Sequence, residues 1–186
     1  MALLSGWKQE YDNNDSLIYL LNAELRIARC NPAWDRFAIA NDGGQAVSSK
    51  VVGAKVLDVV PLALKSFYRT AYGNVQRFRR DWWHVFECSS PTVSRAFQMR
   101  ILSCGDGGLL TINTLLREVP LEPEPCGNVE DYAATDGIVT MCSHCRRVRN
   151  LRQSAAWDWV PELLTRERVL VTFGLCDFCA AYHGHR

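Results

Sequence analysis

The pattern of apolar and polar positions changes along the N-terminal part of the chain, from spacing typical of strands to spacing typical of helices. Residues 16–21 are mainly apolar, and residues 25–29 alternate apolar and polar side chains after an Asn-Ala-Glu turn, which is typical of a β-hairpin. An Asn-Pro pair at 31–32 predicts the start of a helix over 33–40, since asparagine favours the N-cap and proline the first helical position. Apolar residues at i, i+3 and i+4 spacing predict a longer helix over 62–78.

Three further strands are predicted over 82–88, 96–103 and 109–116, with Ser-Ser-Pro and Gly-Asp-Gly-Gly turn signals between them. Their short connections favour an antiparallel meander. Together with the first hairpin they form a five-stranded antiparallel sheet with helices on one face. The expected fold class is therefore α+β.

An acidic, proline-rich stretch divides the chain. Residues 117–140 carry one base and six acids, whereas residues 1–116 and 141–186 each have a net charge of +3. Alternating proline and glutamate is typical of a semi-rigid, solvated linker. We therefore expect an N-terminal segment at 1–14, a first domain at 15–117, a linker at 118–136 and a small unit at 137–186.

Composition narrows the class of protein. The 186 residues are 48% hydrophobic and 22% charged, a composition typical of globular proteins. The net charge of +1 argues against electrostatic attraction of the whole molecule to nucleic acid or lipid. The longest apolar runs are far below the roughly 20 residues of a membrane span. No secretory signal is visible, so we expect a cytoplasmic protein, where clustered cysteines are more often metal ligands than disulfides.

The order of elements over about 15–116 resembles the PAS domain. The resemblance rests on four features: the early hairpin, the Asn-Pro-Ala-Trp helix start at 31–34, the Val-Gly-Ala-Lys-Val-Leu-Asp-Val-Val-Pro segment at 52–61 and the three closing strands. The resemblance implies a sensory or interaction module. It also implies a core that can hold a small ligand, although the same side chains can simply fill the core; the candidates are Trp34, Phe37, Phe67, His84 and Phe97. His84 as a haem ligand is a further alternative.

Two C-x-x-C motifs, Cys142–Cys145 and Cys176–Cys179, stand thirty residues apart in the C-terminal part. Each tight loop presents two thiolates on one side, and two facing loops supply four sulfur ligands at about 2.3 Å from a tetrahedral Zn²⁺. A segment of this size has little core of its own, so a structural metal is expected to stabilise it. The expected architecture is a zinc-ribbon-like unit, with strands over 137–141 and 169–173 and a helix over 157–164.

Other uses of these cysteines stay open. Free thiols, an iron site of rubredoxin type and an Fe–S cluster use the same residues, and His144 could replace one cysteine as a ligand. A redox pair fits less well, because it needs one C-x-x-C at a helix start after a strand. Catalytic zinc is disfavoured, since four sulfurs leave no open position.

The C-terminal pattern resembles a tail that follows PAS domains in bacterial signalling proteins. It runs Cys-Ser-His-Cys-Arg-Arg-Val-Arg, then two tryptophans, then Gly-Leu-Cys-Asp-Phe-Cys. Such tails commonly carry Ser-His-Gly before the second motif, whereas Thr172-Phe173-Gly174 stands here, so any role of that histidine is lost. The four arginines after the first motif (Arg146, Arg147, Arg149 and Arg152) fit a solvated face better than a nucleic-acid patch.

The function expected from these patterns is a non-catalytic signalling module. No Gly-rich phosphate loop follows a strand, and the clustered carboxylates lie in the proline-rich stretch. Leu3, Leu4 and Trp7 form a short apolar stripe near the N-terminus, which predicts a homodimer, with packing on the chain's own sheet as the alternative. A signalling protein partner is also expected. A nucleic-acid-binding regulator and an iron or haem redox sensor are the alternative functions.

Overall fold

A computed structural model of the protein describes residues 7–90, 93–120, 129–153, 156–160, 163 and 169–182. The chain divides into two compact units. The first unit consists of Met1–Val60, Lys65–Val85 and Phe97–Leu115, and the second of Pro61–Leu64, Phe86–Ala96 and Leu116–Arg186. Strands of the first unit therefore continue into segments that belong to the second.

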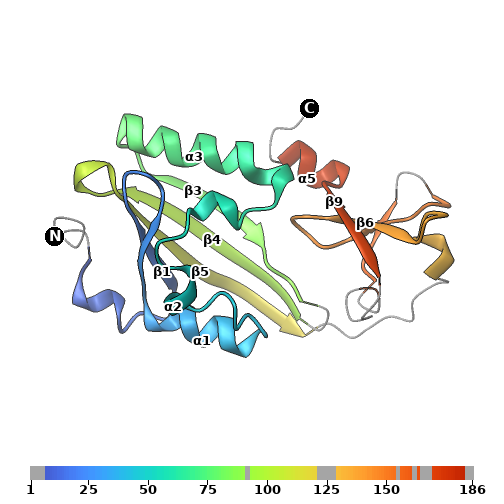
Figure 1. The fold of residues 1–186 in the computed structure, drawn as a ribbon, viewed down its shortest axis with the longest axis horizontal. Coiled ribbons are helices and arrows are strands. Elements are labelled where there is room, and N and C mark those ends of the chain that lie inside the picture. The colour runs from blue at the N-terminus through green and yellow to red at the C-terminus, as the bar shows by residue number, and fades with distance from the viewer. Residues whose placement is uncertain are drawn as a thin grey trace. The chain divides into compact units, whose positions relative to one another are not determined.

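The predicted five-stranded sheet is confirmed (Figure 1). Its strands are β1 (Leu17–Leu21), β2 (Ile27–Cys30), β3 (Trp82–Glu87), β4 (Val93–Ser103) and β5 (Leu109–Pro120), in the order β2-β1-β5-β4-β3. The last strand returns to the middle of the sheet, where it pairs antiparallel with β1 from Leu17 opposite Asn113 to Leu21 opposite Leu109. This closing pair joins segments almost a hundred residues apart.

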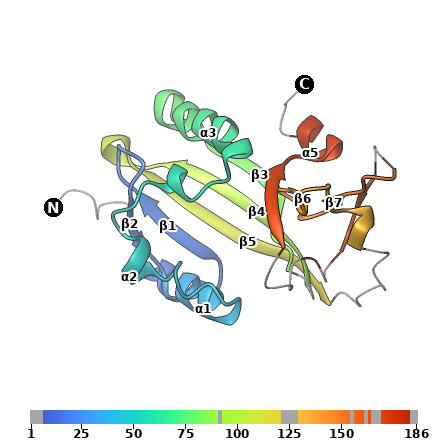
Figure 2. The same ribbon diagram turned by 45° about the vertical axis from the view of Figure 1, so that its right-hand side comes forward.

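Helices cover one face of this sheet (Figure 2). They are α1 (Pro32–Ala40), α2 (Ser48–Val51) and α3 (Lys65–Phe78), with single 3₁₀ turns at Val56–Asp58, Leu62–Leu64 and Gly105–Gly107. Tyr19 of β1 shows how the face is covered: its ring lies 5.4 Å from that of Trp34 on α1, and its hydroxyl is 2.9 Å from that of Tyr72 on α3. Burial raises the pKa of both tyrosines, so both hydroxyls stay protonated in the core. None of the helices in the described part of the chain is long and apolar enough to cross a membrane.

The opposite face of the sheet is covered at β1 by the start of the chain. Ile18, Leu20 and Leu110 form a buried cluster against which Trp7 and Tyr11 pack, the latter from the 3₁₀ turn Gln9–Tyr11. Trp7 also donates a hydrogen bond to Asp12. Part of the apolar stripe expected to join two copies thus packs on its own sheet, whereas Leu3 and Leu4 lie outside the described residues.

The second unit contains a four-stranded sheet of order β8-β7-β6-β9. Its elements are β6 (Ile138–Cys142), β7 (Val148–Arg149), β8 (Trp157–Asp158), β9 (Leu170–Gly174), a 3₁₀ turn at Val129–Asp131 and α5 (Asp177–Tyr182). β6 runs parallel to β9 and antiparallel to β7. A small core lies beside the sheet, made of Tyr132, Val139, Met141, Val148, Val160 and Leu163.

One prediction for the second unit is wrong. The helix expected over 157–164 does not start at Trp157, because Trp157–Asp158 form β8 and pair with β7 at Arg149 and Val148. A tryptophan fits a half-buried strand well, and pairing with a neighbouring strand overrides the local helical spacing. Val160 from this segment is buried as expected, while Leu164 lies outside the described residues.

The stretch expected as a linker, 118–136, takes part in both neighbouring regions. Its first residues continue β5 as far as Pro120. Its last residues belong to the second unit, where Tyr132 is buried and donates a hydrogen bond of 2.9 Å to Asp158. The residues between them, 121–128, lie outside the described part of the chain.

Candidate metal centre

The first C-x-x-C motif forms the turn between β6 and β7. Cys142 is the last residue of β6, and its N–H donates to the carbonyl of Arg147 at 2.8 Å, which closes the hairpin. Arg146 takes a positive φ of 64°, which turns the chain back directly after Cys145. Both cysteines are buried, and the turn places them on the same side of the hairpin.

The second motif lies at the start of a helix instead of in another tight loop. Cys176 directly precedes α5, and Cys179 is in its first turn, where the Cys179 N–H lies 3.5 Å from the Cys176 sulfur. Residues three apart lie on one side of a helix. The parallel pairing of β6 and β9 sets Cys142 beside Gly174, and so the ends of both strands bring the two motifs together.

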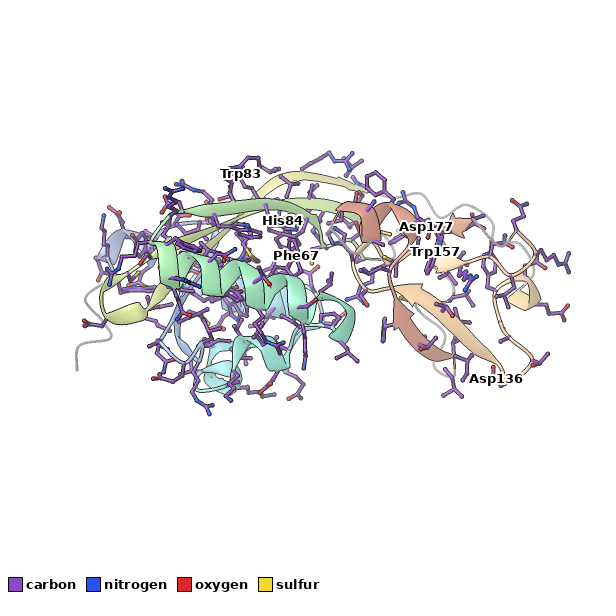
Figure 3. The ribbon with its side chains drawn as sticks, turned by 90° about the horizontal axis from the view of Figure 1, so that it is seen from above. Phe67, Trp83, His84, Asp136, Trp157 and Asp177 are labelled. Carbon is purple, nitrogen blue, oxygen red and sulfur yellow. The ribbon has the colours of Figure 1, made fainter. Side chains whose placement is uncertain are left out.

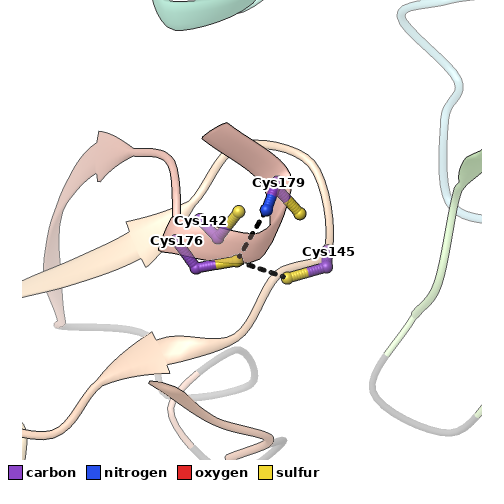
Figure 4. Close-up of side chains that lie close together, drawn as sticks. All are labelled: Cys142, Cys145, Cys176 and Cys179. Carbon is purple, nitrogen blue, oxygen red and sulfur yellow. Dashed lines mark hydrogen bonds between the residues drawn. The ribbon is translucent and has the colours of Figure 1, made fainter. Parts of the chain in front are cut away.

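The four sulfur atoms of Cys142, Cys145, Cys176 and Cys179 lie within 4.8 Å of one another (Figure 4). A tetrahedron with metal–sulfur bonds of about 2.3 Å has sulfur atoms roughly 3.8 Å apart. The sulfurs of Cys145 and Cys176 are 3.8 Å apart, which matches that edge. All four side chains are buried, with Trp157 and Leu175 packed against them. The arrangement fits a closed tetrahedral site with four thiolate ligands.

The electrostatics of the cluster also favour a bound cation. Hydrogen bonds from the thiols of Cys145 and Cys179 hold the pKa of Cys142 far below its usual range. The same contacts with Cys142 raise the pKa of Cys145 to about 12 and that of Cys179 well above its usual value. One thiolate therefore disfavours ionisation of its neighbours, and a divalent cation removes this conflict by binding all four in the ionised form.

The two residues inside the first motif are not ligands in this arrangement. His144 accepts a hydrogen bond at Nε2 from the backbone N–H of Glu87, at 3.1 Å, and burial lowers its pKa. Ser143 is buried, and its N–H donates to the carbonyl of Gly174 at 2.8 Å. Its hydroxyl has no hydrogen-bond partner among the described residues.

The basic run after the first motif is more varied than a single solvated face. Arg146 stacks over Phe173 of β9, with its guanidinium carbon 5.8 Å from the ring centroid. Arg152 forms an ion pair with Asp131 at 2.6 Å. Arg147 and Arg149 are exposed. Sequence spacing alone did not indicate an aromatic ring beside these arginines, since Phe173 lies on another strand.

The five residues named as possible ligand contacts in the first unit take part in three pairs of neighbouring aromatic rings. Trp34 meets Tyr19, and Phe37 meets Phe97 edge to face at 5.6 Å. Phe67 lies against His84, with ring centroids 5.1 Å apart (Figure 3). Phe97 and His84 are buried, and the other three are half-buried. All five lie on the elements expected from the sequence, and their use for a ligand belongs to the proposal below.

Sequence reasoning missed two residues at the metal centre. Trp157 was assigned to a helix, but it lies on β8 and packs against the cysteines. His144 was considered as a replacement ligand, but it is half-buried and accepts a hydrogen bond from the Glu87 N–H. Neither contact has a local signal, because each depends on a segment that meets the motif only in the folded chain.

No protein-family model matches the sequence, and no curated protein matches it. Among solved structures, the PAS domain of BvgS from Bordetella pertussis is similar at 17% identity, covering 58% of this chain and 82% of that one with a TM-score of 0.46. The PAS domain of the quorum-sensing receptor RpfR from Cronobacter turicensis, in complex with C12:0, shares 17% identity over 56% of this chain and 96% of its own (TM-score 0.42).

The photoactive yellow protein domain of the sensor histidine kinase Ppr from Rhodospirillum centenum is similar at 14% identity, over 57% of this chain and 97% of that domain, with a TM-score of 0.45. These matches cover between 56% and 58% of this chain. The chain is thus similar to PAS and photoactive yellow protein domains over a little more than half of its length.

Proposed function

We propose that the protein is a non-catalytic, cytoplasmic signalling module that binds one structural Zn²⁺ through Cys142, Cys145, Cys176 and Cys179. The observation that carries this proposal is the cluster of four buried sulfur atoms within 4.8 Å of one another. Four thiolates complete the coordination of zinc and leave no position for a substrate. A metal bound in this way supports structure instead of chemistry.

The first unit is the sensory part in this proposal. Its five-stranded sheet and helices are those that the PAS resemblance implies, and a small ligand near Phe67, His84 and Phe97, or a signalling protein partner, is the expected input. Self-association of two copies, with Leu4 at the contact, belongs to the same proposal.

Metal analysis together with an absorption spectrum of the purified protein tests the centre directly. We expect one zinc per chain in protein purified under reducing conditions, and no visible absorption, because Zn²⁺ has a filled d shell. Iron in place of zinc, detected by metal analysis and by visible absorption, would support the alternative function of a redox sensor. A Soret band would place a haem in the protein, for which His84 is the candidate ligand. Protein without any metal would contradict the proposal.

Nucleic-acid binding is a second candidate, favoured by the pairing of Arg146 with Phe173. Phe173 is 55% exposed, and an exposed ring beside arginines is a feature of surfaces that stack on bases and contact phosphates. An electrophoretic shift with single- or double-stranded DNA that weakens steeply with salt, and is lost in Arg146→Ala, would support it. Absence of a shift at low salt would rule it out for these probes.

A further inference from the structure

The backbone N–H of Glu87, on the edge strand β3, donates a hydrogen bond to a residue of the first C-x-x-C motif. β3 is the last strand of its sheet, so only every second N–H group along it can bond to β4. The N–H of Cys88, just beyond β3, donates to the carbonyl of Arg95 at 3.0 Å. The preceding N–H, that of Glu87, therefore points away from β4 toward the open edge, where it needs a partner from elsewhere.

That partner is the imidazole of His144. Its Nε2 lies 3.1 Å from the Glu87 nitrogen, and both residues belong to the second unit. A neutral imidazole has one acceptor nitrogen, and here the N–H of Glu87 occupies it. His144 is therefore engaged as an acceptor and is not available as a fifth ligand for a metal.

The position of this imidazole depends on the cysteines. His144 stands between Cys142 and Cys145, whose sulfurs are both in the cluster, and the neighbouring Ser143 N–H is bonded to Gly174 at the end of β9. A metal that binds all four sulfurs fixes both ends of this short turn. Without a metal the four sulfurs are no longer bonded to a common centre, and the turn that carries His144 loses this constraint at both ends.

We propose that His144 is a metal-dependent latch, which holds the end of the β3–β4 hairpin (residues 86–90 and 93–96) to the four-cysteine centre through the Glu87 N–H. Zinc occupancy then controls the order of a hairpin whose strands continue from the first unit, since β3 and β4 each pass from one unit into the other. The latch makes His144 a positioning residue instead of a ligand. This inference rests on the proposed zinc site.

The second motif offers a matched control. Phe178 occupies the third position of its four-residue motif, as His144 does in the first motif, but it is 75% exposed. Shortening Phe178 to alanine changes the same position of the other motif without touching the bond to Glu87. His144→Ala removes the acceptor, whereas His144→Gln keeps an acceptor oxygen in the same region.

The experiment is amide hydrogen exchange of the full chain, resolved at Glu87 by NMR, with zinc bound. We expect exchange at Glu87 to be about fivefold faster or more in His144→Ala, as loss of one net hydrogen bond implies. Phe178→Ala should match the natural protein, and His144→Gln should restore part of the protection. The Cys88 amide serves as an internal reference, because its bond to Arg95 lies within the hairpin and should survive in His144→Ala.

A second arm removes the metal with a chelator. Faster exchange at Glu87 after zinc removal, together with an unaltered zinc content in His144→Ala, would support the latch. If zinc binds but Glu87 exchanges at the same rate with and without His144, or with and without the metal, the latch is wrong and the zinc site stands. If no metal binds to the natural protein, the proposed function itself fails.

Discussion

Replacing Cys142 with serine is expected to unfold the C-terminal four-cysteine unit (137–186) and to leave the five-stranded sheet and its helices folded. The small core beside the sheet of this unit comprises six buried apolar residues among those described, and the four-cysteine cluster joins the two motifs at the ends of the paired strands β6 and β9. Metal binding in comparable small domains contributes on the order of 10 kcal/mol to folding. A serine oxygen is a poor substitute for a thiolate on zinc, so most of this contribution is lost.

Metal analysis and an NMR spectrum of the full chain check this prediction. The zinc content should fall well below one per chain, and dispersed signals should persist only for residues of the five-stranded sheet and its helices. Cys88→Ser is the control, because Cys88 is an exposed cysteine outside the cluster and should keep its zinc. A folded second unit with stoichiometric zinc in Cys142→Ser would refute the assignment of Cys142 as a ligand.

The second large effect is expected at Asn31, where alanine should destabilise the first unit by about 3 kcal/mol. This side chain is 1% exposed and caps the start of α1. Its oxygen accepts from the N–H groups of Ile18 and Trp34, and its amide nitrogen donates to the carbonyls of Tyr11, Asn14 and Ser16. Alanine removes all five of these bonds, three of them to carbonyls in the segment before β1, although the Tyr11 carbonyl keeps the N–H of Asn14 and the Trp34 N–H keeps the carbonyl of residue 31.

Chemical denaturation, followed by a probe in the first unit, measures the loss. Asn31→Asp keeps the acceptor but loses the donors, so it should fall between alanine and the natural residue. Asn41→Ala, at the other end of α1, removes one partly buried bond to the carbonyl of Phe37 and should cost roughly 1 kcal/mol or less. Equal effects of Asn31→Ala and Asn41→Ala would contradict the proposed role of Asn31.

Much of the first unit could be predicted from local patterns alone. The hairpin, the start of α1 and the three closing strands each carry their own signal within ten or so residues, such as the Asn-Pro pair that begins α1 at Pro32. The four cysteines of the two C-x-x-C motifs were also named correctly as a set that meets in space. Paired C-x-x-C spacing is informative because few structures other than a metal site need two such pairs.

What the sequence alone determined is therefore most elements of the first unit, their assembly into a five-stranded antiparallel sheet and the identity of the clustered cysteines. The tertiary structure decided how the cysteines are presented: the parallel pairing of β6 with β9 and the helix that begins after Cys176. It also decided that Trp157 joins a strand and that His144 bonds to a backbone group 57 residues away. The pairing of β6 with β9 and the bond between His144 and Glu87 join segments far apart in the chain, and the residues that make such contacts carry no trace of them in their own neighbourhood.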